Sequence, residues 1–194
     1  FSADGTRVIF DPALPVSFPT NFPSELFYFR GISRLNAGPA GASRVTLVLA
    51  LEGSFVPAGD PIAGGQVVFA RTRGTATAGL LPNTRYRLTH PYGSFDAITD
   101  ATGAFRNAGP PDVGNLTPLV FTTALNGNVG PFLQGVPVPG IVPLPGQIGN
   151  PGFAQQVTGS LCAQNFFRIE AIGATGLPIA GTAVRTDQFT TIIG

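Results

Sequence analysis

The side chains that could do chemistry in this sequence are few, and His90 and Cys162 are the most reactive of them. They are the only histidine and the only cysteine, and all 11 basic residues are arginine. A thiolate–imidazole pair needs the two groups within hydrogen-bond reach, which their separation in the sequence does not exclude. The turn-forming residues Pro91 and Gly93 follow His90, so we expect a structural role for this histidine. The absence of lysine excludes Schiff-base chemistry and a phosphate-binding P-loop.

The ten carboxylates are scattered along the chain and show no metal-binding spacing. A calcium loop needs closely spaced acidic residues, and a single histidine cannot supply a zinc site of several histidines. Asp96 and Asp100 are close enough in sequence to share a cation or to flank a sugar, but ion pairs with arginines are the simpler use. Arg168 and Glu170 should lie on the same side of one strand and form an ion pair. We therefore predict a non-enzymatic protein without catalytic residues, cofactor or metal; the alternative is a hydrolase that uses His90 and a carboxylate.

The composition limits the class of protein more strongly than any motif. Charged residues are 11% of the chain, the formal net charge is +1 and the mean hydropathy is +0.27. Nucleic-acid-binding domains usually carry a strong positive charge, so nucleic acid is not expected as a partner. Low charge promotes association, and 16 phenylalanines give apolar area that one small sandwich need not bury completely. The absence of tryptophan and the presence of only three tyrosines argue against a carbohydrate-binding platform.

Short β-rich runs separated by Gly, Pro, Asn and Asp predict the secondary structure. The longest apolar run, 44–55, fits a central strand that is buried on both faces. Runs 84–90 and 165–172 alternate with period two, which is typical of strands with one solvated face. The other expected strands are 6–10, 25–30, 66–73, 94–99, 154–159 and 184–193. We predict an all-β fold, a single antiparallel β-sandwich or jelly-roll-like domain that spans residues 1–194.

Two connections and a set of core residues complete the predicted fold. Residues 100–103 (DATG) should form a hairpin turn between the strands on either side. A short helix over 117–126 is favoured by Thr117 as its cap and Pro118 at its first position, although the β-branched residues that follow also suit a strand. The expected core comprises Phe10, Phe27, Phe29, Val48, Leu49, Phe69, Phe167 and Ile169.

Residues 127–153 form the most unusual segment, with six prolines and no charged residue. Pro-rich apolar sequence tends to be extended and cannot join a central ladder, and a loop of this length is often functional. One interpretation is a lid that packs over an open end of the sheet. The other is an arm that contacts a neighbouring subunit. A lone glycosylation motif precedes the segment at Asn115.

The start of the chain indicates export. The sequence begins at Phe1 and contains no methionine, which we interpret as removal of a leader, most simply a signal peptide. No apolar run approaches the roughly 18 residues that span a bilayer. We therefore expect a secreted or cell-surface, extracellular protein without a membrane span.

Several strings occur along the chain in an order that is familiar from one group of proteins. They are LPVSFPTNFPSE (14–25), LTHPYG (88–93), GPFL (130–133), VTGS (157–160), NFFRIE (165–170) and TDQFT (186–190). With these strings the chain resembles a group of uncharacterised secreted proteins from bacteria. The resemblance implies an exported bacterial protein with one domain, and it supplies no catalytic residue. Members of the group carry additional cysteines that this chain lacks, so any disulfide that they imply does not transfer.

The leading hypothesis is a secreted structural protein that self-assembles into an extracellular filament or a surface layer, with copies of itself as its partners. Subunits would join by β-strand addition, in which residues 1–10 complete a neighbour's sheet, or through the Pro/Gly-rich arm at 127–153. The predicted assembly interface comprises Phe1, Val8, Ile9, Phe10, Pro137, Val138, Pro139, Ile141, Val142, Pro143, Leu144 and Pro145. The alternative is a monomeric cell-surface adhesion or ligand-binding module.

Overall fold

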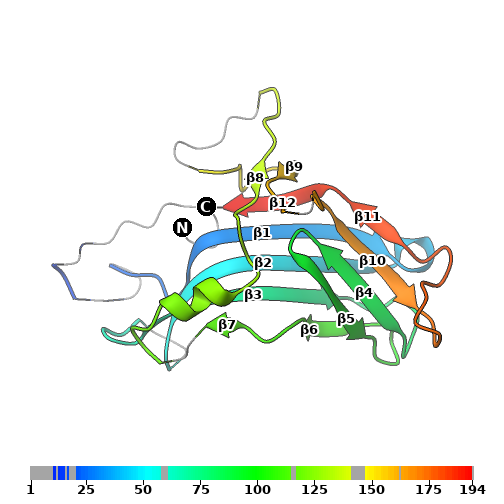
Figure 1. Cartoon of the computed structure of the whole chain (residues 1–194), viewed down its shortest axis with the longest axis horizontal. Coiled ribbons are helices and arrows are strands. Elements are labelled where there is room, and N and C mark those ends of the chain that lie inside the picture. Colours follow the sequence, from blue (N-terminus) through cyan, green and yellow to red (C-terminus); the bar gives the residue numbers. More distant parts are fainter. Residues whose placement is uncertain are drawn as a thin grey trace.

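Two antiparallel β-sheets make up most of the regular structure in this computed structural model (Figure 1). The structure describes residues 11, 13–15, 17, 21–57, 61–114, 117–140, 147–161 and 163–193, with the backbone alone at 191 and 192. The predicted all-β fold and the β-sandwich are confirmed. The predicted strand at 6–10, the core residue Phe10, Asn115 and Cys162 lie outside the described residues.

The larger sheet is built around three long consecutive strands, β1 (Leu26–Ala37), β2 (Ser43–Phe55) and β3 (Gln66–Ala76). β2 pairs with β1 on one side and with β3 on the other, so it is central, as its apolar sequence predicted. The strand order is β6-β3-β2-β1-β12-β9-β8, and β7 also pairs with β3. The shorter strands are β6 (Phe105–Ala108), β7 (Val113–Gly114), β8 (Gln134–Gly135), β9 (Gln155–Thr158) and β12 (Gln188–Ile193).

A smaller sheet lies over part of one face of the larger sheet, and its strand order is β11-β10-β4-β5. Its strands are β4 (Arg85–His90), β5 (Gly93–Ile98), β10 (Phe167–Ile172) and β11 (Val184–Thr186). Figure 1 shows this sheet in front of the larger one and over its right-hand part. The left-hand ends of β1–β3 extend beyond it. The 3₁₀ helix η2 (Thr122–Asn126) lies in front of those ends.

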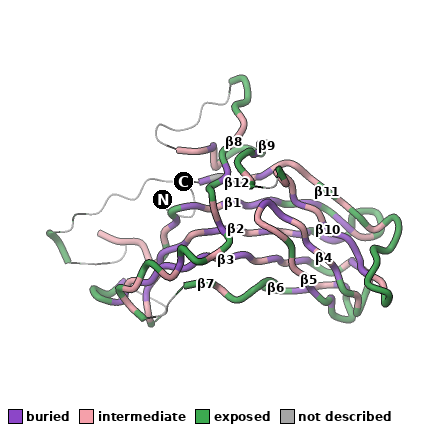
Figure 2. The backbone as a smooth tube through the Cα atoms, in the orientation of Figure 1, coloured by how far each residue is buried: buried purple, intermediate pink, exposed green. Residues whose placement is uncertain are grey.

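Alternate residues of the strands fill the space between the two sheets, as the pleat of a β-strand requires. Leu47 and Leu49 of β2 are fully buried, and they share one apolar core with Leu88 of β4 and with Phe167 and Ile169 of β10. Figure 2 shows buried backbone along the long strands where the small sheet faces them. The period-two alternation of 84–90 and 165–172 therefore identified the inward faces correctly.

Six of the expected core residues are buried, and one is not. The buried residues are Phe27, Phe29, Leu49, Phe69, Phe167 and Ile169. The prediction was wrong for Val48, which is half-buried because it lies between Leu47 and Leu49 and faces the other side of the sheet.

The two sheets approach closely at Gly74 of β3. A Cβ atom at Gly74 would lie 2.8 Å from Cδ2 of Leu88 and 3.1 Å from Cζ of Phe95. Both neighbours belong to the small sheet. A side chain at Gly74 would therefore require the ends of the Leu88 and Phe95 side chains to shift.

Three sequence-based predictions of local structure were wrong in detail. Residues 100–103 do form a turn, closed by a 3.0 Å hydrogen bond from the Gly103 amide to the Asp100 carbonyl. This turn joins β5 to β6, which belong to different sheets, so it is not a hairpin. The expected helix over 117–126 is the shorter 3₁₀ helix η2, and the expected strand 184–193 divides into β11 and β12 at Asp187. Within the described residues, no helix has the length and apolarity to cross a membrane.

Candidate functional site

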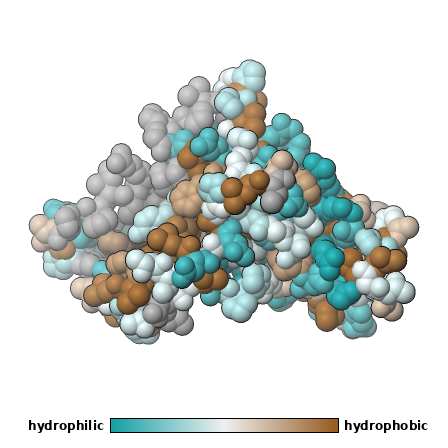
Figure 3. Space-filling view, in the orientation of Figure 1, coloured by the Kyte–Doolittle hydropathy of each residue, from teal (hydrophilic) through white to brown (hydrophobic). Residues whose placement is uncertain are grey.

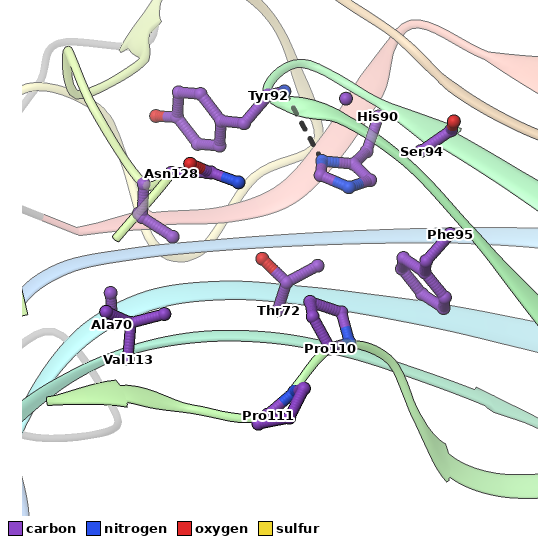
Figure 4. A pocket seen from close by; sticks show the side chains of 12 residues that line it. Ala70, Thr72, His90, Tyr92, Ser94, Phe95, Pro110, Pro111, Val113 and Asn128 are labelled. Carbon is purple, nitrogen blue, oxygen red and sulfur yellow. Dashed lines mark hydrogen bonds between the residues drawn. The ribbon is translucent and has the colours of Figure 1, made fainter. Parts of the chain in front are cut away.

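His90 lies at the end of β4, where it faces a cavity between the two sheets. The alternation that turns Tyr86 and Leu88 inward continues to His90, which is 4% exposed. The cavity has a volume of about 220 Å³. Its floor includes Thr72 of β3, and its opposite wall is formed by the Pro110-Pro111 connection between β6 and β7 (Figure 4).

The hydrogen bonding of His90 defines the tautomer of its neutral ring. The backbone amide of Tyr92 donates a 3.3 Å hydrogen bond to Nδ1, so the neutral ring carries its proton on Nε2. Burial lowers the pKa of His90 to about 4, and the ring is therefore neutral at pH 7. Within the described part of the chain this is the one hydrogen bond that His90 makes. Figure 4 shows Nε2 on the side of the ring that faces Thr72.

The described carboxylates lie outside the lining of the His90 cavity. None of the residues that line the cavity is a carboxylate, so no described acid can orient or charge the imidazole. Asp96 pairs instead with Arg87, with 2.9 Å between Nε and Oδ1. Asp100 accepts hydrogen bonds from Thr102 and from the amide of Ala104 within its own turn. The two aspartates thus have separate structural partners and do not form a common site.

The ionic groups of the described chain form pairs and a small network. Arg168 and Glu170 form the ion pair that their spacing on β10 predicted. On the outer face of the larger sheet, Arg71 lies 3.1 Å from Oε2 of Glu52 and 2.9 Å from Oδ2 of Asp112. Burial raises the pKa of Glu52, a hydrogen bond with Glu25 adds to this effect, and Arg71 opposes it. Among the described residues no group of three or more His, Cys, Asp and Glu side chains could hold a metal ion.

An apolar groove opens at the end of the larger sheet that the small sheet does not cover. Four aromatic side chains contribute to its walls, Phe22, Tyr28, Phe55 and Phe121. The rings of Phe22 and Phe55 pack edge to face with their centroids 5.4 Å apart. The groove has a volume of about 320 Å³, and no charged residue lines it. We call this feature the aromatic groove.

The rim of the aromatic groove is exposed and includes a strained leucine. Tyr28 is 52% exposed, and Leu119 is 59% exposed. Leu119 also has a φ of +67°, which is the left-handed region that a leucine rarely adopts. The amide of Leu119 donates a 2.9 Å hydrogen bond to the carbonyl of Gln66, the first residue of β3. This bond holds Leu119 against the start of that strand. Figure 3 shows hydrophobic side chains gathered at the left of the molecule, over the segment that contains η2.

The predicted assembly residues fall into two groups. Pro137, Val138 and Pro139 lie on a segment that follows β8 and projects away from both sheets, and all three are exposed there (Figure 1). The other members of the predicted interface lie outside the described residues: Phe1, Val8, Ile9, Phe10, Ile141, Val142, Pro143, Leu144 and Pro145. The beginning of the Pro/Gly-rich segment behaves differently, because Val129 and Leu133 are buried in the core.

Sequence reasoning found the projecting segment but missed the aromatic groove and the His90 cavity. The cavity had a detectable signal, because the inward period of β4 places a polar histidine after Tyr86 and Leu88. The groove had none, since it depends on where the small sheet ends. Comparison of the chain with protein-family models, with curated proteins and with solved structures found no match.

Proposed function

We propose that this protein is a secreted, non-enzymatic structural subunit that self-assembles, as an extracellular filament or a surface layer. The observation that carries the proposal is the aromatic groove, a partly exposed apolar surface at the uncovered end of the larger sheet. Such surfaces on a stable protein usually mark an interface. The occupant that we propose is the arm of a second copy, which we define as residues 136–145 (VPVPGIVPLP).

The sequence of the arm suits an aromatic groove. Four of its ten residues are proline and none is charged. Proline-rich segments favour the extended polyproline II conformation, which exposes both side chains and backbone carbonyls and needs little ordering on binding. Recognition of such segments commonly uses grooves lined by aromatic side chains. Since the groove also lacks charged residues, neither surface would have to bury an ion when the two meet.

The groove contains one polar group suited to a proline-rich backbone. The Oε1 atom of Gln66 is buried and has no hydrogen-bond partner within the described part of the chain. The side-chain amide of glutamine offers both a donor and an acceptor, and a rotation of its terminal group exchanges them. Gln66 can therefore satisfy one backbone carbonyl of the arm, which the prolines leave without a local partner.

The backbone of Leu119 also favours an interface at this place. A leucine in the left-handed conformation costs roughly 1–2 kcal/mol, and burial does not compensate because the side chain is 59% exposed. Strain of this kind is commonly retained where a side chain serves binding. In the assembly, the Leu119 side chain would be covered by the arm of the neighbouring subunit.

The positions of the two surfaces favour an open chain of subunits. The arm follows β8, at one edge of the larger sheet, whereas the groove lies at the ends of β1, β2 and β3 near η2 (Figure 1). A contact between two different surfaces is heterologous, and it extends into a filament unless the rotation between subunits closes a ring.

Strand addition by residues 1–10 belongs to the same proposal as a second contact. In strand addition, an extended segment joins the edge of a neighbour's sheet through main-chain hydrogen bonds. Val8, Ile9 and Phe10 would suit such an added strand by their β-propensity.

A mixing experiment tests the arm and the groove together. The groove variant Phe121→Ser and the arm variant Val138→Asp should each fail to polymerise in electron microscopy and light scattering. An equimolar mixture should form heterodimers, because one variant keeps a working arm and the other keeps a working groove. Leu177→Ser is the matched control, since Leu177 is 67% exposed and lies outside the groove. A native protein that stays monomeric over a concentration series, or a control that fails like Phe121→Ser, would reject the proposal.

A further inference from the structure

The His90 cavity is a second feature that needs an explanation, and it is separate from the aromatic groove because the two share no lining residue. It contains a histidine that is 4% exposed, with one ring nitrogen bonded to the Tyr92 amide and the other directed at the cavity (Figure 4). The Nε2–H group has no hydrogen-bond partner among the described residues, so it is available to a ligand in the cavity. We propose that the cavity binds a small neutral ring compound that carries a carbonyl oxygen.

The polar groups of the cavity define the recognised atom. With its proton on Nε2, His90 is a hydrogen-bond donor toward the cavity. The hydroxyl of Thr72 lies on the opposite side and can donate or accept, and the Asn128 amide also lines the cavity (Figure 4). Thr72 is 7% exposed, so its hydroxyl is fixed in a largely buried position. Two donors that face the same space suit one carbonyl oxygen, which has two lone pairs.

The other walls define the body of the ligand. Phe95, Pro110, Pro111 and Val113 provide apolar surfaces on the remaining sides. Flat proline and aromatic faces pack well against a ring. No side chain that lines the cavity is charged, so an ionic ligand would lose its hydration without gaining a partner. The ligand class is therefore neutral, cyclic and weakly polar.

The size and access of the cavity agree with this class. Its volume of about 220 Å³ is several times that of a water molecule, which occupies about 30 Å³ in the liquid. An adjoining space of about 310 Å³ shares Tyr92, Gly93 and Asn128 with it and also contacts Gly127 and Gly130. The phenol of Tyr92 donates a 2.8 Å hydrogen bond to the carbonyl of Pro131, which holds the β4–β5 turn beside this entrance.

The single histidine makes the test selective. In the 194-residue chain labelled with ¹⁵N-histidine, His90 gives the only imidazole nitrogen signals. δ-Valerolactam, a neutral cyclic amide, is the probe, and piperidinium is its charged counterpart. We expect the lactam to shift the Nε2 signal saturably with a Kd on the order of 1 mM, as befits a ligand of this size. Piperidinium should produce no saturable shift.

Two variants connect the signal to the cavity. Thr72→Val keeps the shape of the side chain but removes the hydroxyl, and it should weaken lactam binding about threefold to tenfold. Thr75→Val makes the same change on the outer face of β3 and should leave binding unchanged. Asn128→Ala, at an exposed position, provides a second weakening variant that does not depend on core packing. The absence of a saturable Nε2 shift, an equal response to piperidinium, or equal binding by Thr72→Val and Thr75→Val would overturn the proposal.

Discussion

The inner face of the larger sheet has two ends that are similar in composition but differ in exposure. Under the small sheet, Leu47 and Leu49 have no exposed surface. At the other end the floor of the aromatic groove is buried, with Phe55 only 3% exposed, but its rim residues Tyr28 and Leu119 are 52% and 59% exposed. Both ends include residues of the same strand, β2.

The difference shows that an apolar strand does not by itself specify a closed core. The small sheet has four strands and covers the inner face only in part, so the long strands continue beyond it (Figures 1 and 2). In a sandwich, the length of the covering sheet decides which apolar residues become core and which become surface. Mutations under the small sheet should therefore mainly affect folding. Mutations in the uncovered part of the face should mainly affect association.

The largest effect on stability is expected under the small sheet. Leu49→Ala removes a fully buried side chain from the centre of the core and should lower the free energy of unfolding by about 2–5 kcal/mol. Urea denaturation followed by circular dichroism measures this change. Leu125→Ala is the control, because Leu125 is 76% exposed and its loss should be nearly neutral. A loss below about 1 kcal/mol at Leu49 would show that the covered end is no better packed than the groove.

A smaller effect, dependent on pH, is expected at His90, where the covered region ends. The pKa of His90 in the folded protein is about 4, below the ordinary value of 6.5. The unfolded chain therefore takes up a proton first as the pH falls, and stability that is present above pH 6.5 is lost between about pH 6.5 and pH 4. Over this pH range the free energy of unfolding should fall by an amount on the order of 3 kcal/mol.

The measurement compares urea unfolding of the native protein and of His90→Gln at several pH values in this range. Since a glutamine side chain does not titrate, the difference between the two curves isolates the histidine from the carboxylates. Parallel curves would mean that His90 accepts a proton in the folded state, and the cavity would then be open to water.

The sequence allowed the class of fold and most of its strands to be predicted, because period-two alternation and turn residues act locally. It identified the inward faces of β4 and β10 and the central position of β2. It missed β7 and β8, which have two residues each and no periodicity. The turn at 100–103 was assigned to a hairpin because local sequence does not tell whether the next strand joins the same sheet.

The candidate sites were less predictable, because local sequence does not show which distant segments the fold brings together. The arm is visible in the sequence since proline excludes it from a central ladder. The groove is assembled from segments near 22–28, 53–55, 66–68 and 119–121, which only the tertiary fold brings together. His90 is visible as a residue, but its cavity depends on the Pro110-Pro111 connection on the other sheet.

The smallest effect on stability, and the sharpest contrast with Leu49, is expected at Leu119. Asparagine tolerates the left-handed backbone better than leucine, so Leu119→Asn should raise the free energy of unfolding of the monomer by up to about 1 kcal/mol. The same change removes an apolar side chain from the rim of the groove and should weaken assembly.

Ala40→Asn is the matched control for Leu119→Asn, because Ala40 has a φ of +52°, is exposed and lies outside the groove. Both variants should gain a similar small amount of stability in urea denaturation, but only Leu119→Asn should raise the concentration at which polymer forms in light scattering. If Leu119→Asn assembles as readily as Ala40→Asn, the exposed end of the inner face is not the interface. A leucine kept in a strained conformation would then have no role in association, and its retention would have to be explained by the local packing of the residues that join β7 to η2.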